Sequence, residues 1–356
     1  MNPYTQLAYW KSFFHGDGYS HDQIPDLTGK VAIVTGANSG LGYATTVALA
    51  AHGAQVFLAC RNQYRAQEAI NRVKEEIKSK HLKASSPQLE FLELDLGDMN
   101  KAQQAAQEFL KKGLPLHILV NNSGIIGGPL ELSADGIESE FAVNHMGHFV
   151  FTLALLDRIK ESQPSRIVIM SSIFHEKAAG INYDTILKTG DTPQPHHQSV
   201  YDRYARSKLA NVLFARALAR RVINERRLYV NACHPGYVST RSTQPVPREE
   251  ANTFSKFMNG LEEWFHRLVA WPVQRGVLTQ LYLATSPEIE NREIRGQYFG
   301  PIANELEPSA FWKSFCHGDY YFHDQIPDLA GRVAVVTDAN SRLRYATTIA
   351  FIAHEA

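Results

Sequence analysis

Cysteine is scarce in this sequence, and its scarcity excludes two kinds of site. The 356 residues include three cysteines at wide spacings, Cys60, Cys233 and Cys316. An odd number of widely spaced cysteines is typical of reduced thiols, and it provides neither a disulfide framework nor a tetrahedral zinc site. Histidines are more numerous, but their pairs lack a carboxylate or thiol partner at ligand spacing. We therefore expect no metal centre.

An excess of charge and a long hydrophobic run are also missing. The 36 basic residues balance the 36 acidic residues, so no long-range field attracts the chain to nucleic acid or to an anionic membrane. No run of about 18 apolar residues could span a bilayer, and the N-terminus lacks the basic start and apolar segment of a signal peptide. We expect a cytoplasmic protein without a transmembrane segment, whose 44% hydrophobic content suffices for a large α/β core.

Short apolar runs alternate with charged or amphipathic helical stretches along most of the chain. The expected strands cover residues 31–35, 55–59, 89–94, 117–121, 166–170 and 229–233. Regular alternation of strand and helix implies right-handed crossover connections between parallel strands. The sequence therefore predicts a single doubly wound parallel sheet of the Rossmann type, with helices on both faces.

The first expected strand runs directly into a glycine-rich turn. Gly36, Gly40 and Gly42 separate it from a helix that begins near Leu41 and continues to about Ala51. Glycine lets a ligand approach the main chain, and the free N–H groups of a helix start attract phosphate. The turn thus favours dinucleotide binding. Its spacing differs from the commonest G-x-G-x-x-G fingerprint, so a tight turn without a ligand stays an alternative on this feature alone.

Three segments outside the regular pattern are candidates for other roles. Residues 1–29 form a polar and aromatic leader, for which packing on the domain and peripheral contact with a membrane are both open. Residues 174–203 lack periodicity, which is typical of a loop over a site. Residues 245–272 are predicted to form an amphipathic lid whose aromatic face either packs on the core or lines a site for a lipophilic substrate.

The end of the chain repeats its beginning. Residues 312–356 match residues 10–54 at 32 of 45 positions with a constant offset, so the segment 310–356 is a degenerate partial duplication of residues 8–54. Side chains replace the three glycines of the first turn, and they would block a pyrophosphate: Asp338, Arg342 and Arg344. A lone strand and helix are not independently stable, so we expect this copy to bind no nucleotide and to be poorly ordered.

Several motifs occur in the order found in one known family. The turn 35–42, Asn-Asn-Ser-Gly at 121–124, Tyr-Ala-Arg-Ser-Lys at 204–208 and Pro-Gly at 235–236 together resemble the classical short-chain dehydrogenases/reductases, and most of all their retinol dehydrogenase-like branch. The resemblance covers about residues 28–300. It implies one domain at about residues 30–305 that transfers a hydride between a nicotinamide cofactor and an alcohol or ketone.

The same resemblance assigns the residues that bind the cofactor. It places them on the turns that follow the expected strands and on the Tyr-x-x-x-Lys pair. The matching positions are Gly36, Asn38, Ser39, Gly40, Leu41, Gly42, Arg61, Asp95, Leu96, Asn121, Asn122, Gly124, Tyr204, Lys208, Pro235, Gly236, Val238 and Thr240. Ser123 stands where the family has Ala, a small departure that we expect to be harmless.

The end of the second strand indicates which dinucleotide is bound. NAD-specific relatives carry a carboxylate there for the ribose hydroxyls, whereas this chain has Ala-Cys-Arg-Asn at 59–62. The Arg61 guanidinium can bind a 2′-phosphate through charge-assisted hydrogen bonds. We therefore expect NADP(H), with a solvated surface arginine as the alternative interpretation of Arg61.

Four positions match the catalytic residues of the family: Asn144, Ser172, Tyr204 and Lys208. Tyr204 and Lys208 are one helical turn apart and share a face. A free phenol has a pKa of about 10, so general acid–base work near neutrality needs anion stabilisation, which the Lys208 ammonium and an oxidised nicotinamide can supply. Ser172 is assigned over Ser171 by the family's Ser-x-x-Gly register, but His175 departs from that register and leaves the choice of serine open.

The predicted function is therefore an NADP(H)-dependent short-chain oxidoreductase that acts on a ketone or alcohol of a lipophilic molecule, such as a secondary metabolite, retinoid or steroid. One alternative is an inactive paralogue, which the degenerate repeat suggests. Another is a lipid-surface scaffold that uses the aromatic leader and lid. Because the family commonly dimerises through two long helices, here near residues 137–161 and 199–224, the resemblance also offers a homodimer.

Overall fold

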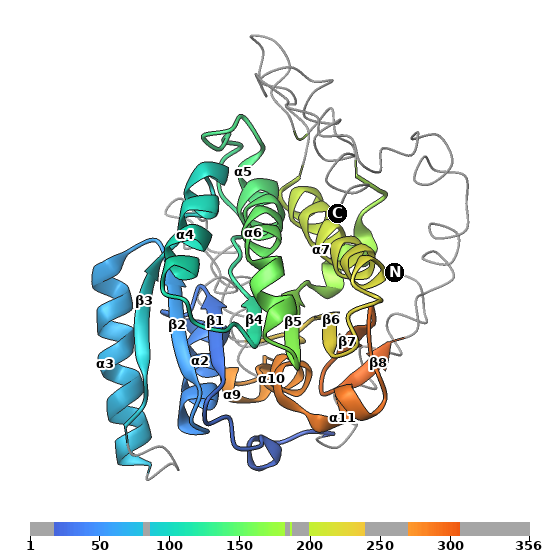
Figure 1. Ribbon diagram of the computed structural model, residues 1–356. Helices are drawn as coiled ribbons and strands as arrows, with labels where there is room; N and C mark the ends of the chain where they lie inside the picture. Colours follow the sequence, from blue (N-terminus) through green and yellow to red (C-terminus); the bar gives the residue numbers. More distant parts are fainter. Residues whose placement is uncertain (1–17, 81–85, 182–185, 187–198, 239–269, 307–356) are drawn as a thin grey trace, which may run out of the picture.

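The computed structural model describes residues 18–80, 86–181, 186, 199–238 and 270–306 (Figure 1). Several sequence-based predictions lie outside the described residues. They concern most of the leader, nearly all of the expected lid, most of the expected loop at 174–203, Thr240, and the whole repeat at 310–356. These stay predictions.

One eight-stranded sheet forms the centre of the described structure. Its strands are β1 (Val31–Thr35), β2 (Gln55–Cys60), β3 (Leu89–Glu93), β4 (Ile118–Asn121), β5 (Ser165–Met170), β6 (Leu228–Cys233), β7 (Tyr298–Gly300) and β8 (Asn304–Leu306). In space they follow the order β3-β2-β1-β4-β5-β6-β7-β8. All neighbours from β3 to β7 are parallel, and β8 is antiparallel to β7. The predicted doubly wound α/β fold is confirmed.

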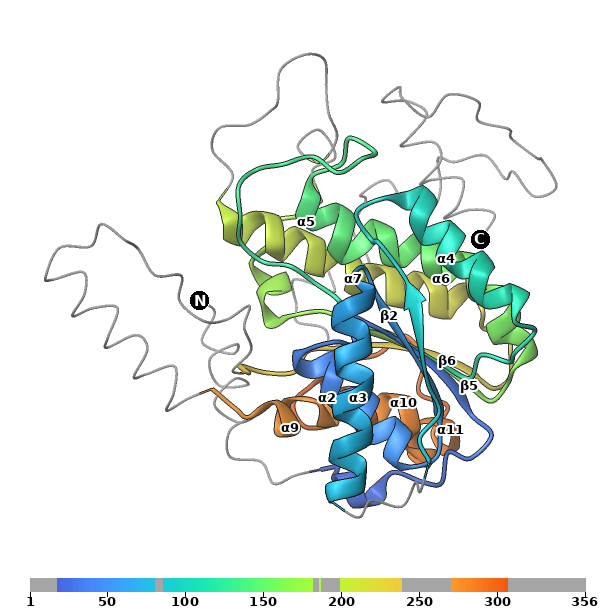
Figure 2. The same cartoon turned by 90° about the vertical axis from the view of Figure 1, so that its left-hand side faces the viewer.

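Helices cover both faces of this sheet (Figure 2). On one face lie α2 (Gly40–Ala51), α3 (Gln63–Ser79), α9 (Val273–Gly276) and α10 (Leu278–Thr285). On the other lie α4 (Met99–Lys111), α6 (Gly147–Glu161) and α7 (Val200–Arg221). Two short α-helices are α5 (Ser139–Phe141) before α6 and α11 (Pro287–Asn291) after α10, and shorter 3-10 or π turns lie at His21–Gln23, Ala142–Met146 and Ile173–Lys177.

Strand β1 shows how the sequence determines the two hydrophobic cores. All five of its residues are buried. Ala32 and Val34 pack into the core beneath α2 and α10, whereas Val31 and Ile33 pack into the core beneath α4 and α6. Successive side chains of a strand point to opposite faces, so a strand covered on both sides must be apolar throughout.

The structure differs from the predicted elements mainly outside the six expected strands, whose ends agree to within one residue. Strands β7 and β8 were not predicted, because three residues are too few to show an alternating pattern. The expected loop at 174–203 differs from the structure at its start, whereas the expected helix near 199–224 is confirmed as α7. Residues Ile173–Lys177 form a 3-10 helix, and α7 already begins at Val200 because the Ser199 side chain accepts the Asp202 N–H as its N-cap.

The parallel strands place the candidate residues at one edge of the sheet. The residues that follow β1, β2, β3, β4, β5 and β6 all lie at the carboxyl ends of those strands. The strand order reverses direction between β1 and β4, and the crevice at such a reversal is where open α/β sheets bind ligands. The fold thus brings the predicted site residues together.

Candidate active site

The turn after β1 is packed so closely that it requires glycine. Gly36 has a φ of +65° and donates its N–H to the Ala59 carbonyl at 2.9 Å. A Cβ added to Gly42 would lie 2.7 Å from Asn122 Nδ2 and closer still to the Gly36 carbonyl. Both glycines are therefore needed by the geometry of the turn itself.

The start of α2 supplies the donors that a phosphate needs. Ser39 occupies the N-cap position, but its side chain makes no capping hydrogen bond within the described structure. The first N–H groups of α2, from Gly40 to Gly42, therefore have no partner in the helix. Arg72 Nη2 donates to the Asn38 carbonyl at 3.0 Å and fixes the preceding loop. Unpaired N–H groups beside closely packed glycines suit a pyrophosphate, so these residues fit a dinucleotide.

Asn122 ties the turn after β4 to the end of β1. Its Nδ2 donates to the Thr35 carbonyl, and the main-chain N–H groups of Asn122 and Ser123 both donate to Thr35 Oγ1, each at 2.9 Å. Asn121 points into the interior, where its Nδ2 donates to Thr152 Oγ1 at 2.7 Å. Asn122 thus shapes the crevice directly, whereas Asn121 is part of the packing behind it.

The residues after β2 and β3 border the adenosine end of a bound dinucleotide in the sequence-based assignment. Arg61 is exposed immediately after β2. Asp95 lies beyond β3, and its Oδ1 accepts the Gly97 N–H at 3.0 Å. Leu96 beside it is buried. The guanidinium of Arg61 is accordingly accessible, and the Asp95 carboxylate keeps its second oxygen at 3.8 Å from Lys101 Nζ.

The turn after β6 closes the other side of the crevice. Gly236 has a φ of +82°, which favours glycine. Pro235 is half-buried, while Val238 is buried and pairs with Trp271 in an isolated parallel bridge. Thr240 lies outside the described residues. The bridge fixes the path of the chain where it leaves the turn.

Tyr204 and Lys208 lie on the same face of α7, as their spacing predicts. Lys208 Nζ is 5.5 Å from the centroid of the Tyr204 ring and donates to the Met170 carbonyl at 3.3 Å. Lys208 is only 4% exposed. A Cβ on Gly124 would approach Lys208 Nζ to 3.1 Å, so the turn after β4 lies directly against this ammonium group.

The two serines after β5 bond in different directions. Ser171 Oγ is buried and donates to the Lys208 carbonyl at 2.7 Å, which joins β5 to α7. Ser172 bonds the Tyr204 side chain and accepts the Phe174 N–H at 3.3 Å. The His175 ring, 2.6 Å from the Ser172 carbonyl, supports this turn from behind. The geometry therefore favours Ser172 as the serine that faces the reacting group.

Asn144 lies in a π-helical turn, Ala142–Met146, at the start of α6. Its Oδ1 accepts the Ile125 N–H at 2.7 Å, and its Nδ2 donates to the Ile125 carbonyl at 2.9 Å and to Ser207 Oγ at 3.0 Å. Single π turns inside helices are frequent at functional sites. Here the turn aims Asn144 between α7 and the loop after β4.

Burial shifts the pKa values of the pair on α7 in opposite directions. It raises the pKa of Tyr204 to about 12, which the hydrogen bond from Ser172 lowers in part and the charge of Glu140 raises further. It lowers the pKa of Lys208 to about 8, against the charge of Glu140. The protein alone therefore disfavours the tyrosinate. The anion stabilisation expected from the sequence has to include a positive charge brought by the cofactor.

His148 is a structural member of the site that the sequence analysis did not identify. Its Nδ1 lies 3.2 Å from the Asn144 carbonyl and its Nε2 lies 2.8 Å from Thr35 Oγ1. Because a carbonyl only accepts, we assign the proton to Nδ1, so that Nε2 accepts from the Thr35 hydroxyl. Burial lowers the pKa of His148 to about 3 and keeps it neutral. The sequence signal that could have identified His148 is its position four residues after Asn144.

The described residues lack the features required for a metal site and for a membrane-spanning helix. Among the described residues, no group of histidine, cysteine and carboxylate side chains is arranged to hold a metal ion. No helix in the described ranges has both the length and the apolar character needed to cross a bilayer.

Comparisons with known proteins agree with this geometry. A family model for short chain dehydrogenase matches residues 30–183. Retinol dehydrogenase 14 from Homo sapiens is 38% identical over 298 residues, which cover 80% of this chain and 82% of that protein. An uncharacterized oxidoreductase from Schizosaccharomyces pombe is 37% identical over 294 residues, 80% of each chain. The chain belongs to the short-chain dehydrogenase family.

Membership makes this short-chain dehydrogenase an NAD(P)(H)-using oxidoreductase that acts on CH–OH groups of small molecules. A solved structure from Beutenbergia cavernae, assigned as an NAD(P)-dependent gluconate 5-dehydrogenase and containing bound NADP, has a similar fold. Its TM-score is 0.55 at 25% identity, and the match covers 77% of this chain and 96% of that chain.

Proposed function

We propose that this short-chain dehydrogenase uses NADP(H) and interconverts a ketone and an alcohol on a lipophilic small molecule. The observation that carries the proposal is the meeting of Ser172, Tyr204 and Lys208 at the same edge of the sheet as the start of α2 and the exposed Arg61. The residues that would hold the cofactor are those of the turns after β1, β4 and β6, together with Arg61, Tyr204 and Lys208.

The chemistry of the chain's own residues follows from their positions. When bound, the nicotinamide supplies or accepts the hydride at the substrate carbon. In reduction, Tyr204 Oη donates its proton to the carbonyl oxygen while the Ser172 hydroxyl bonds the same oxygen, so that an alcohol is formed. In oxidation, Tyr204 Oη takes the proton back. The Lys208 ammonium stabilises the tyrosinate, and the Asn144 amide holds the loop after β4 beside the pair.

Preference for NADP(H) is supported by the end of β2. No carboxylate follows the strand there, and Arg61 stands exposed at the position next to the expected ribose. Loss of a charge-assisted hydrogen bond costs about 1.5–3 kcal/mol, or roughly 10- to 100-fold in affinity. An arginine in this place therefore favours the dinucleotide with a 2′-phosphate.

A lipophilic substrate is supported by apolar side chains that stay exposed in the loop after β4 and at the start of α7. Ile125, Leu130 and Leu132 follow β4 and are 36%, 36% and 41% exposed. Tyr201, one turn before Tyr204, is 60% exposed and stacks on Phe174 with 5.8 Å between ring centroids. The Phe174 ring also meets Tyr204 edge-on. Phe174 and Tyr201 therefore form an apolar border to Tyr204.

Titration with NADPH and NADH, followed by the fluorescence of the dihydronicotinamide, tests the cofactor assignment. We expect Arg61→Ala to weaken NADPH binding about tenfold or more and to leave NADH binding unchanged. Arg65→Ala, which removes another exposed arginine near the start of α3, is the matched control and leaves both affinities unchanged. Equal affinity of the wild type for NADPH and NADH would contradict the assignment.

Turnover of ketones that differ only in alkyl length tests the substrate class. Each additional buried methylene contributes about 0.8 kcal/mol, so we expect kcat/KM to rise about three- to fourfold per methylene until the border is covered. A series without length dependence would remove the lipophilic assignment and leave the oxidoreductase class untouched.

A further inference from the structure

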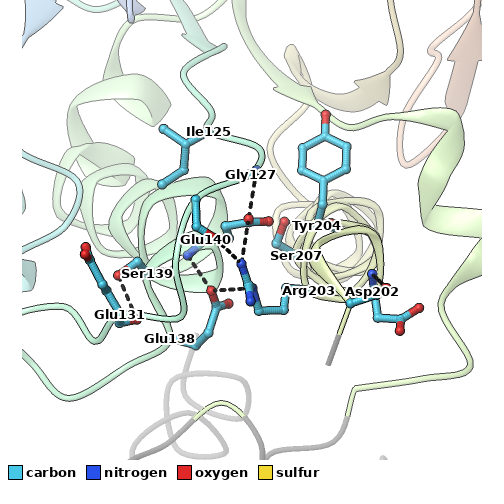
Figure 3. Close-up of polar contacts among 12 residues, drawn as sticks. Ile125, Gly127, Glu131, Glu138, Ser139, Glu140, Asp202, Arg203, Tyr204 and Ser207 are labelled. Atoms are coloured by element: carbon cyan, nitrogen blue, oxygen red, sulfur yellow. Dashed lines mark hydrogen bonds and ion pairs between the residues drawn. The ribbon is translucent and has the colours of Figure 1, made fainter. Parts of the chain in front are cut away.

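The loop at 125–128 is held at Ile125, Gly127 and Gly128 by side chains from three elements: α5, the π turn before α6, and α7. Asn144 bonds both main-chain groups of Ile125. Glu140 Oε1 accepts the Gly127 N–H at 3.0 Å, and Arg203 Nη2 donates to the Gly128 carbonyl at 2.8 Å. Figure 3 shows Glu140 between Gly127 and Arg203. The family assignment accounts for Asn144, but it gives no role to Glu140 or Arg203.

Glu140 and Arg203 belong to a buried cluster of charges. Arg203 lies 3.6 Å from Glu140 Oε1 and 3.5 Å from Glu138 Oε1, and all three side chains are at least 95% buried. Glu138 also caps α5 by accepting the N–H groups of Glu140 and Phe141. Removing one member of a buried ion pair leaves an uncompensated charge, so such a cluster fixes its elements firmly. Because this cluster of Glu138, Glu140 and Arg203 lies between α5, α7 and the loop, we call it the clamp.

The clamp lies next to the reacting pair. Arg203 and Tyr204 are neighbours on α7, and their side chains leave the helix in different directions, Arg203 toward the two glutamates and Tyr204 away from them (Figure 3). The charge of Glu140 nevertheless acts on both reacting residues and raises the pKa values of Tyr204 and Lys208. A low-dielectric interior transmits such an interaction beyond direct contact.

The charged groups that face Glu140 come from two elements. Glu138 approaches from its own helix start, and Arg203 and Arg206 approach from α7. Burial and the like charge of Glu138 raise the pKa of Glu140 to about 7, while Arg203 and the Gly127 N–H oppose this. Glu140 Oε2 is buried and has no hydrogen-bond partner among the described residues. Its charge is therefore only partly stabilised.

We propose that Glu140 and Arg203 are positioning residues, which fix the loop at 125–128 beside α7 through their ion pair and their hydrogen bonds to Gly127 and Gly128, and that the negative charge of the buried Glu140 carboxylate acts from this position on the Tyr204–Lys208 pair. The proposal deepens the proposed function and rests on it for its catalytic meaning. The charge effect itself can be measured without turnover.

Titration of Lys208 by NMR tests the charge effect in the full-length chain. With lysine labelled at ¹³Cε, the Lys208 signal is assigned by its loss in Lys208→Arg. In the wild type we expect the Lys208 signal to show a second inflection near the pKa of Glu140, at about 7. In Glu140→Gln this inflection disappears and the Lys208 midpoint falls by about half a pH unit or more.

Two further variants separate charge from position. Glu140→Asp keeps the charge but shortens the reach to Gly127, so the Lys208 midpoint stays near the wild-type value while KM for the substrate rises severalfold. Glu131→Gln removes an exposed carboxylate from the same segment and changes neither quantity. Thermal unfolding of each variant reports whether it is folded. If Glu140→Gln does not fold, the inflection in the wild-type titration decides the question.

The pH dependence of alcohol oxidation connects the charge effect with catalysis. We expect the rising limb of the pH profile to lie at lower pH in Glu140→Gln than in the wild type. At a pH on that limb, the fraction of plateau activity reached should be about threefold larger in Glu140→Gln than in the wild type. A Lys208 signal without an inflection in the wild type, or an unchanged midpoint in Glu140→Gln, would overturn the proposal. If the Lys208 signal behaves as expected but the wild type shows no turnover, the result would contradict the proposed function only.

Discussion

Ser171 and Ser172 show how much depends on the direction of a single side chain. Both follow β5, and the family register alone left the choice between them open. The structure separates them because Ser171 Oγ is buried against the Lys208 carbonyl, whereas Ser172 bonds the Tyr204 side chain. One serine thus holds two elements together, and we propose that the other bonds the reacting oxygen.

A pair of alanine variants tests this distinction. Ser172→Ala removes a donor to the developing alkoxide, so we expect kcat to fall about 100-fold with little change in thermal stability. Ser171→Ala removes a buried hydrogen bond, so we expect a loss of about 1 kcal/mol in the free energy of unfolding and a much smaller change in kcat. Steady-state kinetics and thermal unfolding measure both. The opposite pattern would exchange the two assignments.

At the scale of the element, the sequence predicts well wherever its pattern is long. The six longer strands and the start of α2 show clear apolar or glycine signals, and their ends agree with the structure to within one residue. Strands β7 and β8 are too short to show a period. The π turn that carries Asn144 has no distinctive composition, because it arises from packing against α7 and the loop after β4.

The residues of the candidate site were likewise predictable where the sequence pattern is local. Residues within a local motif, such as Tyr204 and Lys208, were predictable from spacing. Glu140 and Arg203 were not, because their partners are distant in sequence and only the fold brings them together. The direction of the Tyr204 pKa also depends on burial, which the local sequence does not reveal.

The turn between β1 and α2 gives a prediction for an element. In Gly42→Ala the new methyl group would meet the Gly36 carbonyl and Asn122, so we expect a loss of about 1–3 kcal/mol in stability and much weaker NADPH binding. Gly97→Ala is the control, since its Cβ would make an ordinary contact of 3.4 Å with Asp95. Equal behaviour of the two variants in binding and unfolding experiments would refute the described packing.

At the scale of the whole molecule, buried histidines link stability to pH. Full or partial burial lowers the pKa of five histidines below the ordinary value of 6.5, to about 3 or about 4: His117, His145, His148, His175 and His234. The unfolded chain therefore binds more protons than the folded chain below pH 6.5, and stability falls as the pH falls. Glu140 and Glu176, whose pKa values are raised, act in the opposite sense but are fewer.

Thermal unfolding between about pH 7.5 and 5.5 checks this balance. Each fully buried histidine contributes about 1 kcal/mol of lost stability per pH unit below its unfolded pKa, so we expect a steep fall in Tm across this range. Calorimetry in buffers of different ionisation enthalpy should show proton uptake on unfolding. A Tm that stays constant or rises toward pH 5.5 would show that these histidines are already charged in the folded protein.

The central claim is that Tyr204 moves the proton in a reaction whose cofactor is held mainly by other residues. The most direct test compares wild type and Tyr204→Phe for NADPH binding and for NADPH-dependent reduction of a lipophilic ketone. Phenylalanine keeps the ring but removes the hydroxyl to which the proposal assigns the proton transfer. We predict nearly unchanged NADPH affinity and a turnover at least about 100-fold lower. Retained turnover in Tyr204→Phe would contradict the account.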